Sequence, residues 1–221
     1  DHEYLWLHTL AFMKPIVSEK DFPTANKFVY LNAANVALMY SGAEQIITEW
    51  VADVAQNGSN NFDDHAEENV FKDLHRAAAH LINAAPDDIA AGSSATELLC
   101  SLAWAVSPGK DKNVVSTEIV FPSTVYPWQR VARSTGCEIR LAKEKNNFIY
   151  TDDIIDLIDR HTAVVCISHV EYGNGQTYDL NLLSDAAHEQ GALLVVDATQ
   201  SAGSIPIDVQ ACPVDALISG A

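Results

Sequence analysis

The stretch Leu193-Leu194-Val195-Val196-Asp197-Ala198-Thr199-Gln200-Ser201 joins a short apolar run to a polar loop. Four consecutive Leu and Val residues are typical of a strand that is buried in a parallel sheet. The run ends at Asp197, so we expect its carboxylate at the carboxyl edge of the sheet, where open α/β sheets bind their ligands. Such a carboxylate could hold the proton on the nitrogen of a pyridine ring, or it could cap the following turn.

Around this stretch, from about residue 85 onward, strand-like segments alternate with helical ones. The alternation predicts an α/β fold with a mostly parallel sheet and flanking helices. Strands are expected at residues 113–116, 137–141, 163–168, 192–197 and 214–219, with a further strand-like segment at 88–91. Helices are expected at residues 95–106, 124–134, 152–160 and 180–190.

The first 85 residues have a different pattern, which predicts helices at 43–55 and 67–83 and a polar break at 57–64. We interpret this region as a cover or dimerisation layer. The apolar segment 4–13 is interrupted by His8 and preceded by two acidic residues, so neither a signal peptide nor a membrane span fits. An N-terminal amphipathic arm is therefore expected at residues 1–25, followed by a large cofactor-binding domain at 26–221.

The net charge disfavours nucleic acid and membranes as partners, and the cysteine spacing disfavours a metal site. The chain has 13 basic and 30 acidic residues and a formal charge of −17, which repels nucleic acid and anionic membranes. Its four cysteines are far apart and lack the paired spacing of metal ligands, so we expect reduced thiols and a cytoplasmic protein. The acidic residues at 63–68 indicate a solvated face, and no metal is expected.

The segment Gly92-Ser93-Ser94-Ala95-Thr96-Glu97 precedes an almost wholly apolar predicted helix. Ser94 and Glu97 have the spacing of a capping box, and small residues would let a phosphate approach the free N–H groups at the start of the helix. This segment therefore predicts either an anion site or an ordinary helix cap. A dinucleotide site is disfavoured, because no strand is followed by a complete G-x-G-x-x-G and no Walker lysine motif is present.

Two further loops follow predicted strands. In Phe121-Pro122-Ser123-Thr124 the ring of Phe121 could stack on a flat cofactor or belong to the core, and Ser123 could cap the next helix. The loop of residues 168–176 carries His169, which could be a proton carrier or a structural residue. A phosphate site, a ring platform and a partner for a ring nitrogen are together what pyridoxal 5'-phosphate (PLP) requires.

With these motifs the chain resembles the class V aminotransferase family, fold type I PLP enzymes that include cysteine desulfurases, isopenicillin N epimerase-like proteins and kynureninases. The resemblance runs from Tyr30-Leu31-Asn32-Ala33-Ala34 to the end of the chain and is most specific at residues 94–97 and 197–200. The segments 121–123 and 170–176 look more like the kynureninase and epimerase-like branches than the desulfurases, which place a histidine over the ring.

The resemblance implies a role for each matching residue. Ala95 and Thr96 would bind the phosphate through their backbone, Phe121 would stack on the ring, and Asp197 would pair with its nitrogen. Gln200 would hydrogen-bond the phenolic oxygen or support the aldimine.

Other matching positions carry less specific roles. Ser168 would lie near the phosphate or the ring, and Tyr172 or Asn174 would lie in the substrate region. In this family the Schiff-base lysine follows a sequence of the type Asp-x-x-x-Ser-Gly, which Asp215 to Gly220 match. The lysine is therefore expected at residue 222 or 223, just beyond Ala221, and we expect a fragment, or a sequence cut at a modified lysine, that lacks the small C-terminal domain.

We therefore expect a cytoplasmic, homodimeric PLP-dependent enzyme that acts on an amino acid, with Asp197 and Gln200 in its catalytic site. Its chemistry would be a Cβ-lyase or desulfurase-like cleavage, or a transaminase or epimerase-like reaction. The alternative is a non-catalytic fragment or scaffold of this fold that lacks the Schiff-base lysine.

Overall fold

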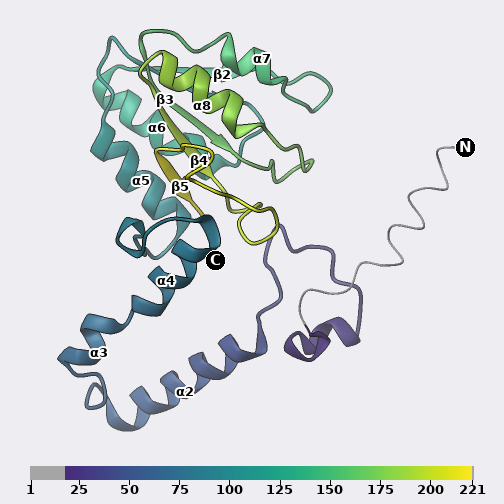
Figure 1. Ribbon diagram of the computed structural model, residues 1–221, viewed down its shortest axis with the longest axis vertical. Helices are drawn as coiled ribbons and strands as arrows, with labels where there is room; N and C mark the ends of the chain where they lie inside the picture. The colour runs from purple at the N-terminus through teal and green to yellow at the C-terminus, as the bar shows by residue number, and fades with distance from the viewer. Residues whose placement is uncertain (1–17, 221) are drawn as a thin grey trace, which may run out of the picture. The chain divides into compact units, whose positions relative to one another are not determined.

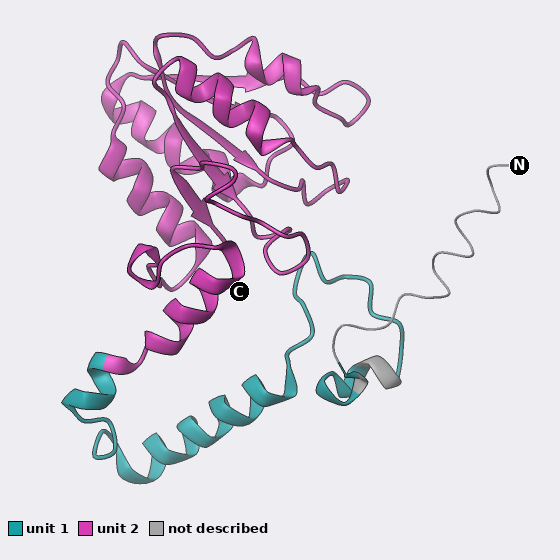
Figure 2. Ribbon diagram, in the orientation of Figure 1, with its two compact units in different colours: residues 1–68 teal, residues 69–221 magenta. Residues whose placement is uncertain are grey.

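The computed structural model describes residues 18–220 and divides the chain into two compact units, residues 1–68 and residues 69–221 (Figures 1 and 2). The amphipathic segment predicted at residues 4–13 lies outside the described residues. A domain boundary near residue 25 stays a prediction, because the division at residue 68 concerns compactness and not the cofactor-binding domain.

The regular elements in the described part of the first unit are helical. Two 3₁₀ turns, η1 (Glu19–Asp21) and η2 (Pro23–Asn26), precede the long helix α2 (Ser41–Asn57). Helix α2 confirms the helix predicted at residues 43–55. It ends at Gly58, whose φ of 61° lies in a region that glycine adopts without strain.

The single helix predicted at residues 67–83 is wrong, because the structure has two helices there. Helix α3 (Asp64–Asn69) ends before Val70, and α4 (Lys72–Ile82) begins after Phe71. Asn69 and Val70 are poor helix formers, which accounts for a break at this point. Helix α4 ends at Asn83, which takes the left-handed conformation that Asn tolerates at helix ends.

The second unit contains a five-stranded parallel sheet with the strand order β2-β1-β3-β4-β5. All five predicted strands from residue 113 onward are present, with ends shifted by one or two residues. Their bounds are β1 (Asn113–Thr117), β2 (Glu138–Ala142), β3 (Thr162–Ser168), β4 (Leu193–Asp197) and β5 (Ala216–Ile218). The parallel α/β fold expected from the sequence is therefore confirmed.

Helices cover both faces of this sheet (Figure 1). Helices α5 (Ala95–Val106) and α6 (Pro122–Thr135) pack on one face, and α7 (Thr151–Ile155) and α8 (Leu180–Glu189) pack on the other. Neighbouring strand residues point to opposite faces, as the period of a strand requires. Cys166 and Val195 thus belong to the core under α5 and α6, while Ile167 and Val196 belong to the core under α7 and α8.

Two predicted elements differ from the structure. The strand-like segment 88–91 is not a strand, because the 3₁₀ turn η3 (Pro86–Asp88) occupies its start, with Pro86 at a position that suits the fixed φ of proline. The helix predicted at 152–160 ends at Ile155. Beyond that point the Asp159 carboxylate accepts a hydrogen bond from the backbone N–H of His161, a local bond that competes with a continuing helix.

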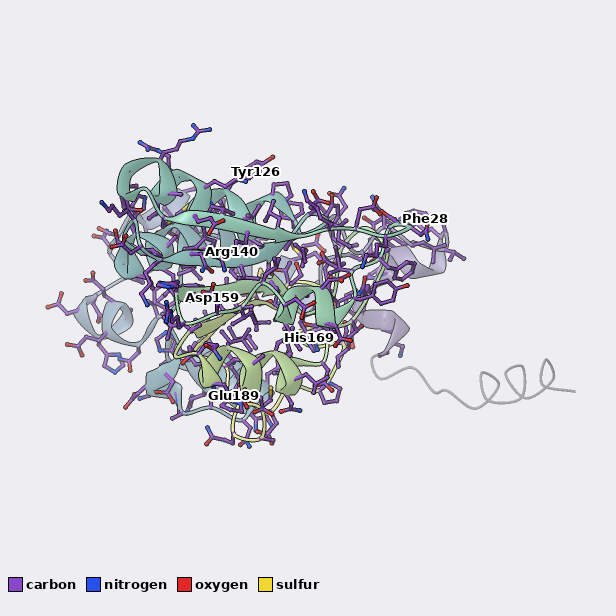
Figure 3. The ribbon with its side chains drawn as sticks, turned by 90° about the horizontal axis from the view of Figure 1, so that it is seen from above. Phe28, Tyr126, Arg140, Asp159, His169 and Glu189 are labelled. Carbon is purple, nitrogen blue, oxygen red and sulfur yellow. The ribbon has the colours of Figure 1, made fainter. Side chains whose placement is uncertain are left out.

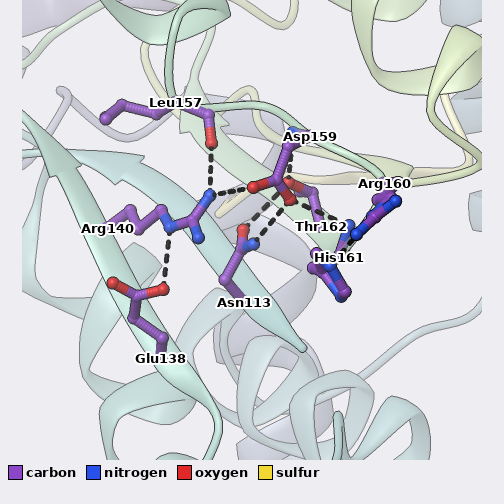
Figure 4. Close-up of polar contacts among 8 residues, drawn as sticks. All are labelled: Asn113, Glu138, Arg140, Leu157, Asp159, Arg160, His161 and Thr162. Atoms are coloured by element: carbon purple, nitrogen blue, oxygen red, sulfur yellow. Dashed lines mark hydrogen bonds and ion pairs between the residues drawn. The ribbon is translucent and has the colours of Figure 1, made fainter. Parts of the chain in front are cut away.

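A polar cluster joins the strands at the amino end of the sheet (Figure 4). The guanidinium of Arg140 donates to the carboxylate of Asp159 at 2.8 Å and to the backbone oxygen of Leu157 at 3.1 Å. Asp159 also accepts from the side-chain amide of Asn113 at 3.1 Å. The Arg140 hydrogen bond and the His161 N–H lower the pKa of Asp159 to about 2, so the carboxylate holds β1, β2 and the turn before β3 together at neutral pH.

Candidate active site

The carboxyl ends of β1, β3 and β4 bring the predicted site residues to one edge of the sheet. The chain runs from β1 outward to β2 and then crosses to β3 on the other side of β1, so the strand order changes direction between β1 and β3. Ligands of open α/β sheets bind beside such a switch point. Ser168 and Asp197 are register partners at the ends of β3 and β4, and His169 follows directly, at the opposite end of β3 from Asp159 (Figure 3).

Asp197 is held in place at this edge by two hydrogen bonds to its carboxyl group. Its side chain is buried, with 6% exposed. Oδ2 accepts a hydrogen bond from the hydroxyl of Thr124 at 2.8 Å, and Oδ1 accepts from the backbone N–H of Thr199 at 3.0 Å. The bond from Thr199 caps the following turn, which was one of the two predictions for Asp197. The bond from Thr124 fixes the carboxylate against helix α6. Among the described residues, no Lys or Arg forms an ion pair with Asp197.

Helix α5 begins where the phosphate site was predicted. Ser94 is its N-cap, and the Ser94 hydroxyl accepts the N–H of Glu97 at 3.1 Å. The Glu97 carboxylate accepts from the backbone and hydroxyl of Ser93, one residue before the partner that a capping box uses, and these bonds lower the pKa of Glu97. Ala95 and Thr96 occupy the first turn, where backbone N–H groups have no acceptor within the helix.

The start of helix α6 lies beside the start of α5. The N-cap of α6 is Phe121 and not Ser123, because Pro122 suits the first helical position. The prediction that Ser123 caps this helix is therefore wrong. Its hydroxyl lies 2.7 Å from the hydroxyl of Thr96 and forms a hydrogen bond with it. Two helix N-termini, with their partial positive charge, thus meet at one place.

Phe121 and Tyr172 form an aromatic pair at the same edge. Their ring centroids are 5.2 Å apart and their planes are inclined at 87°. The Phe121 and Tyr172 residues are 46% and 49% exposed. Phe121 is therefore not a core residue, and both rings are accessible to a ligand.

The loop between β3 and α8 is held from within by a buried carboxyl group. Glu171 is 1% exposed, and its Oε1 accepts hydrogen bonds from the hydroxyls of Thr117 and Tyr178, each at 3.1 Å. Its Oε2 has no hydrogen-bond partner among the described residues. Burial raises the pKa of Glu171, and the charge of Asp197 raises it further.

His169 and Asn174 lie in the same segment after β3. The backbone N–H of His169 donates to the backbone oxygen of Asp197 at 2.9 Å, and burial lowers the pKa of the imidazole, which keeps it neutral at neutral pH. The side-chain amide of Asn174 donates to the backbone oxygen of Asn147 and accepts from the N–H of Gln176. Asn174 is thus held within the loop, whereas Tyr172 remains accessible.

The other predicted site residues, Ser168 and Gln200, lie at or just after the ends of β3 and β4. Ser168 is buried at the end of β3, beside Asp197. Gln200 is half-buried in the turn after β4. The position after Ala221, where the Schiff-base lysine is expected, lies outside the described residues.

Sequence reasoning missed Thr124 and the pair formed by Thr117 and Tyr178. A signal for Thr124 was present, because it shares a helix face with two residues that are wholly buried, Trp128 and Val131. A hydroxyl on such an apolar face requires a partner, and that partner is Asp197. For Tyr178 no pattern in the sequence indicates the contact with Glu171.

The family model for class-V aminotransferases matches residues 30–221. The chain belongs to the class V aminotransferase family. The resemblance inferred from residues 94–97 and 197–200 is therefore confirmed.

Curated members of the class V aminotransferase family extend beyond this chain. An uncharacterized aminotransferase, YcbU, of Bacillus subtilis is 28% identical over 90% of this chain and 52% of its own length. A probable cysteine desulfurase of Methanothermobacter thermautotrophicus is 27% identical over 93% of this chain and 52% of its own length. A kynureninase of Geobacillus thermodenitrificans is 34% identical over 58% of this chain and 32% of its own length. The chain thus spans about half the length of the first two relatives.

Solved structures of PLP enzymes and cysteine desulfurases share the fold. A mutant of C-DES, with glycine covalently linked to its PLP cofactor, superposes with a TM-score of 0.81 at 20% identity, over 92% of this chain and 55% of that one. The apo cysteine desulfurase of Thermococcus onnurineus has a TM-score of 0.75 at 21% identity, over 94% and 54% of the two chains.

None of the helices at residues 18–220 is long and apolar enough to cross a membrane. Within the same range, no three His, Cys, Asp or Glu side chains are grouped so that they could hold a metal ion.

Proposed function

We propose that this protein is a PLP-dependent enzyme that acts on an amino acid. The observation that carries the proposal is the buried carboxylate of Asp197, which has neutral hydrogen-bond donors and no cationic partner among the described residues. A buried anion without a cation is costly, so such a group is expected to meet a positive charge on a ligand. The protonated nitrogen of a pyridine ring fits this requirement.

The remaining requirements of PLP are met by neighbouring groups. The N–H groups of Ala95 and Thr96 would hold the phosphate, and the hydroxyl of Ser123 lies beside them. The exposed ring of Phe121 would stack on the pyridine ring, and Gln200 and Ser168 would contact its edge. When bound, PLP would supply an electron sink for the bonds at the Cα of an amino acid. Asp197 would keep the ring nitrogen protonated, which maintains that sink.

For the reaction, we favour cleavage at Cβ of the substrate. Relatives named cysteine desulfurase and kynureninase support this class. The aminotransferase YcbU supports the alternative, transamination. Product analysis separates them, because sulfide or alanine indicates Cβ cleavage, whereas a keto acid that depends on an amino acceptor indicates transamination.

We further propose a cytoplasmic homodimer with an arm at residues 1–25 and a cofactor-binding domain at 26–221. The free state of all four cysteines supports a reducing compartment. Helix α2 has no buried residue and exposes Ile46, Ile47 and Trp50, an apolar face of the kind that a second subunit covers.

Binding of PLP to the intact protein tests the proposal. We would remove any bound cofactor, titrate PLP into the apoprotein, and measure the dissociation constant by ultrafiltration. The variants would be Asp197→Asn and, as matched control, Glu189→Gln on the exposed surface of α8 (Figure 3).

Wild type and the control are expected to bind PLP equally. The Asp197→Asn variant is expected to bind roughly ten- to a hundredfold more weakly, the range for a hydrogen bond to a charged group. Absence of binding by wild type would refute the proposal. Binding without turnover of any amino acid would favour the alternative of a non-catalytic scaffold.

A further inference from the structure

We propose that Thr124 is the positioning residue for Asp197. The inference rests on the proposed function and deepens it, because it assigns a role in holding the ring nitrogen to a residue that itself contacts only the protein. The assignment starts from one bond, in which the Thr124 hydroxyl donates to Oδ2 of Asp197 at 2.8 Å. Thr124 is fully buried and Asp197 nearly so, so water does not compete for this bond.

The bond joins two elements that are 73 residues apart in sequence. Thr124 lies in the first turn of α6, and Asp197 ends β4. The same turn is tied to β3, because the thiol of Cys166 donates to the backbone oxygen of Thr124 at 3.3 Å. Burial raises the pKa of Cys166 to about 12, so the thiol keeps its proton and remains a donor.

Pro127 removes one hydrogen bond from the first turn of α6. Proline has no N–H, so within α6 the backbone oxygen of Ser123 lacks the donor that a regular helix would supply four residues later. The first turn of α6 is therefore held less by its own helix. It is held instead by the hydroxyl of Thr96, the thiol of Cys166 and the carboxylate of Asp197.

The two donors to Asp197 define the plane of its carboxylate. Thr199 holds Oδ1 from the following turn, and Thr124 holds Oδ2 from the helix. Among the described residues, the other donor to this carboxylate is the N–H of Thr199, so loss of the Thr124 hydroxyl would free the carboxylate to rotate. Thr124 thus restricts Asp197 to one orientation toward a ring nitrogen, which is how a positioning residue contributes to binding.

The test compares PLP with its carbocyclic analogue, in which a CH group replaces the ring nitrogen. We would measure dissociation constants of both ligands for the intact protein as wild type, Thr124→Val, Thr124→Ala and Thr124→Ser. Wild type is expected to prefer PLP. Thr124→Val is expected to weaken PLP binding about tenfold, the effect of one hydrogen bond to a charged group, and to leave binding of the analogue within about twofold. Thr124→Ser keeps the hydroxyl and is expected to retain the preference.

Each outcome has a distinct meaning. Equal weakening of both ligands in Thr124→Val and Thr124→Ala would show a structural role and overturn the inference, while the proposed function would stand. Unchanged preference in these variants would overturn it as well. Two variants without the hydroxyl are included so that misfolding of one leaves the other to decide. Failure of wild type to bind PLP would refute the proposed function, and the inference with it.

Discussion

Replacement of Glu171 by Gln should make the protein progressively more stable than wild type as the pH rises. Glu171 is 1% exposed, and the two hydroxyls of Thr117 and Tyr178 both donate to its Oε1. A glutamine can accept both bonds at the same oxygen, and its NH₂ group replaces the protonated Oε2. At a pH where Glu171 is protonated in both the folded and the unfolded chain, the two proteins should therefore differ by less than about 1 kcal/mol.

The sign of the pH dependence follows from the raised pKa. Burial, with the charge of Asp197, raises the pKa of folded Glu171 above its ordinary value of 4.5. Between 4.5 and the raised value the folded state binds a proton that the unfolded chain has released. The stability contributed by this group is thus fully present below pH 4.5 and is lost as the pH rises to the folded pKa. Within that window wild type loses up to about 1.4 kcal/mol per pH unit relative to the glutamine variant.

The assay is urea-induced unfolding, followed by circular dichroism at a series of pH values from mildly acidic to mildly alkaline. Burial lowers the pKa of His169, but this effect is common to both proteins and cancels in their difference. The control is Glu118→Gln. The exposed ion pair with Lys143 lowers the pKa of Glu118, so its charge does not change in the window, and its stability difference should be constant. A difference for Glu171→Gln that is constant, or that falls with pH, would refute the reasoning.

Three further outcomes follow from the same structure. Leu99→Ala, in a fully buried position of α5, should lower the free energy of unfolding by about 2–5 kcal/mol in a urea titration, and a loss under 1 kcal/mol would contradict the packing described for α5. Asp197→Ala should keep the circular dichroism spectrum and abolish amino-acid turnover, so near-normal turnover would defeat its assignment. Tyr178→Phe should cost about 1 kcal/mol of stability, because Glu171 keeps only the Thr117 donor; a stability equal to wild type would show that this bond contributes nothing.

The parallel sheet could be predicted from the sequence because its central strands β3 and β4 are buried and mostly apolar on both faces. Runs such as residues 193–196 have few polar residues and end at Gly, Pro or a polar loop, and each appears in the structure with nearly the predicted ends. The errors lie where local chemistry competes with periodicity. Pro122 moved the start of α6 ahead of Ser123, and a side-chain bond of Asp159 accompanies the early end of α7.

In the candidate site, the residues at strand ends could be predicted from the sequence. The residues that form hydrogen bonds with them could not. Asp197 and Phe121 follow apolar runs, which places them at the carboxyl edge by the geometry of a parallel sheet alone. The Thr124 bond spans 73 residues and the bond between Thr117 and Glu171 spans 54. Such pairs depend on how α6 and the loop after β3 pack against the sheet, which no local pattern encodes.

Two buried carboxyl groups at this edge of the sheet, those of Asp197 and Glu171, differ in their hydrogen-bond donors. Asp197 receives a donor on each oxygen, which stabilises a negative charge, whereas both donors to Glu171 reach the same oxygen. The charge of Asp197 also helps to raise the pKa of Glu171, so the protein environment opposes two anions at this edge. A protonated ring nitrogen would then meet the fixed carboxylate of Asp197 on β4, while Glu171, through Thr117 and Tyr178, holds the loop that carries Tyr172. Different surroundings for two neighbouring carboxyl groups, with the pKa of Glu171 raised, are the arrangement expected where a single positive charge must be bound.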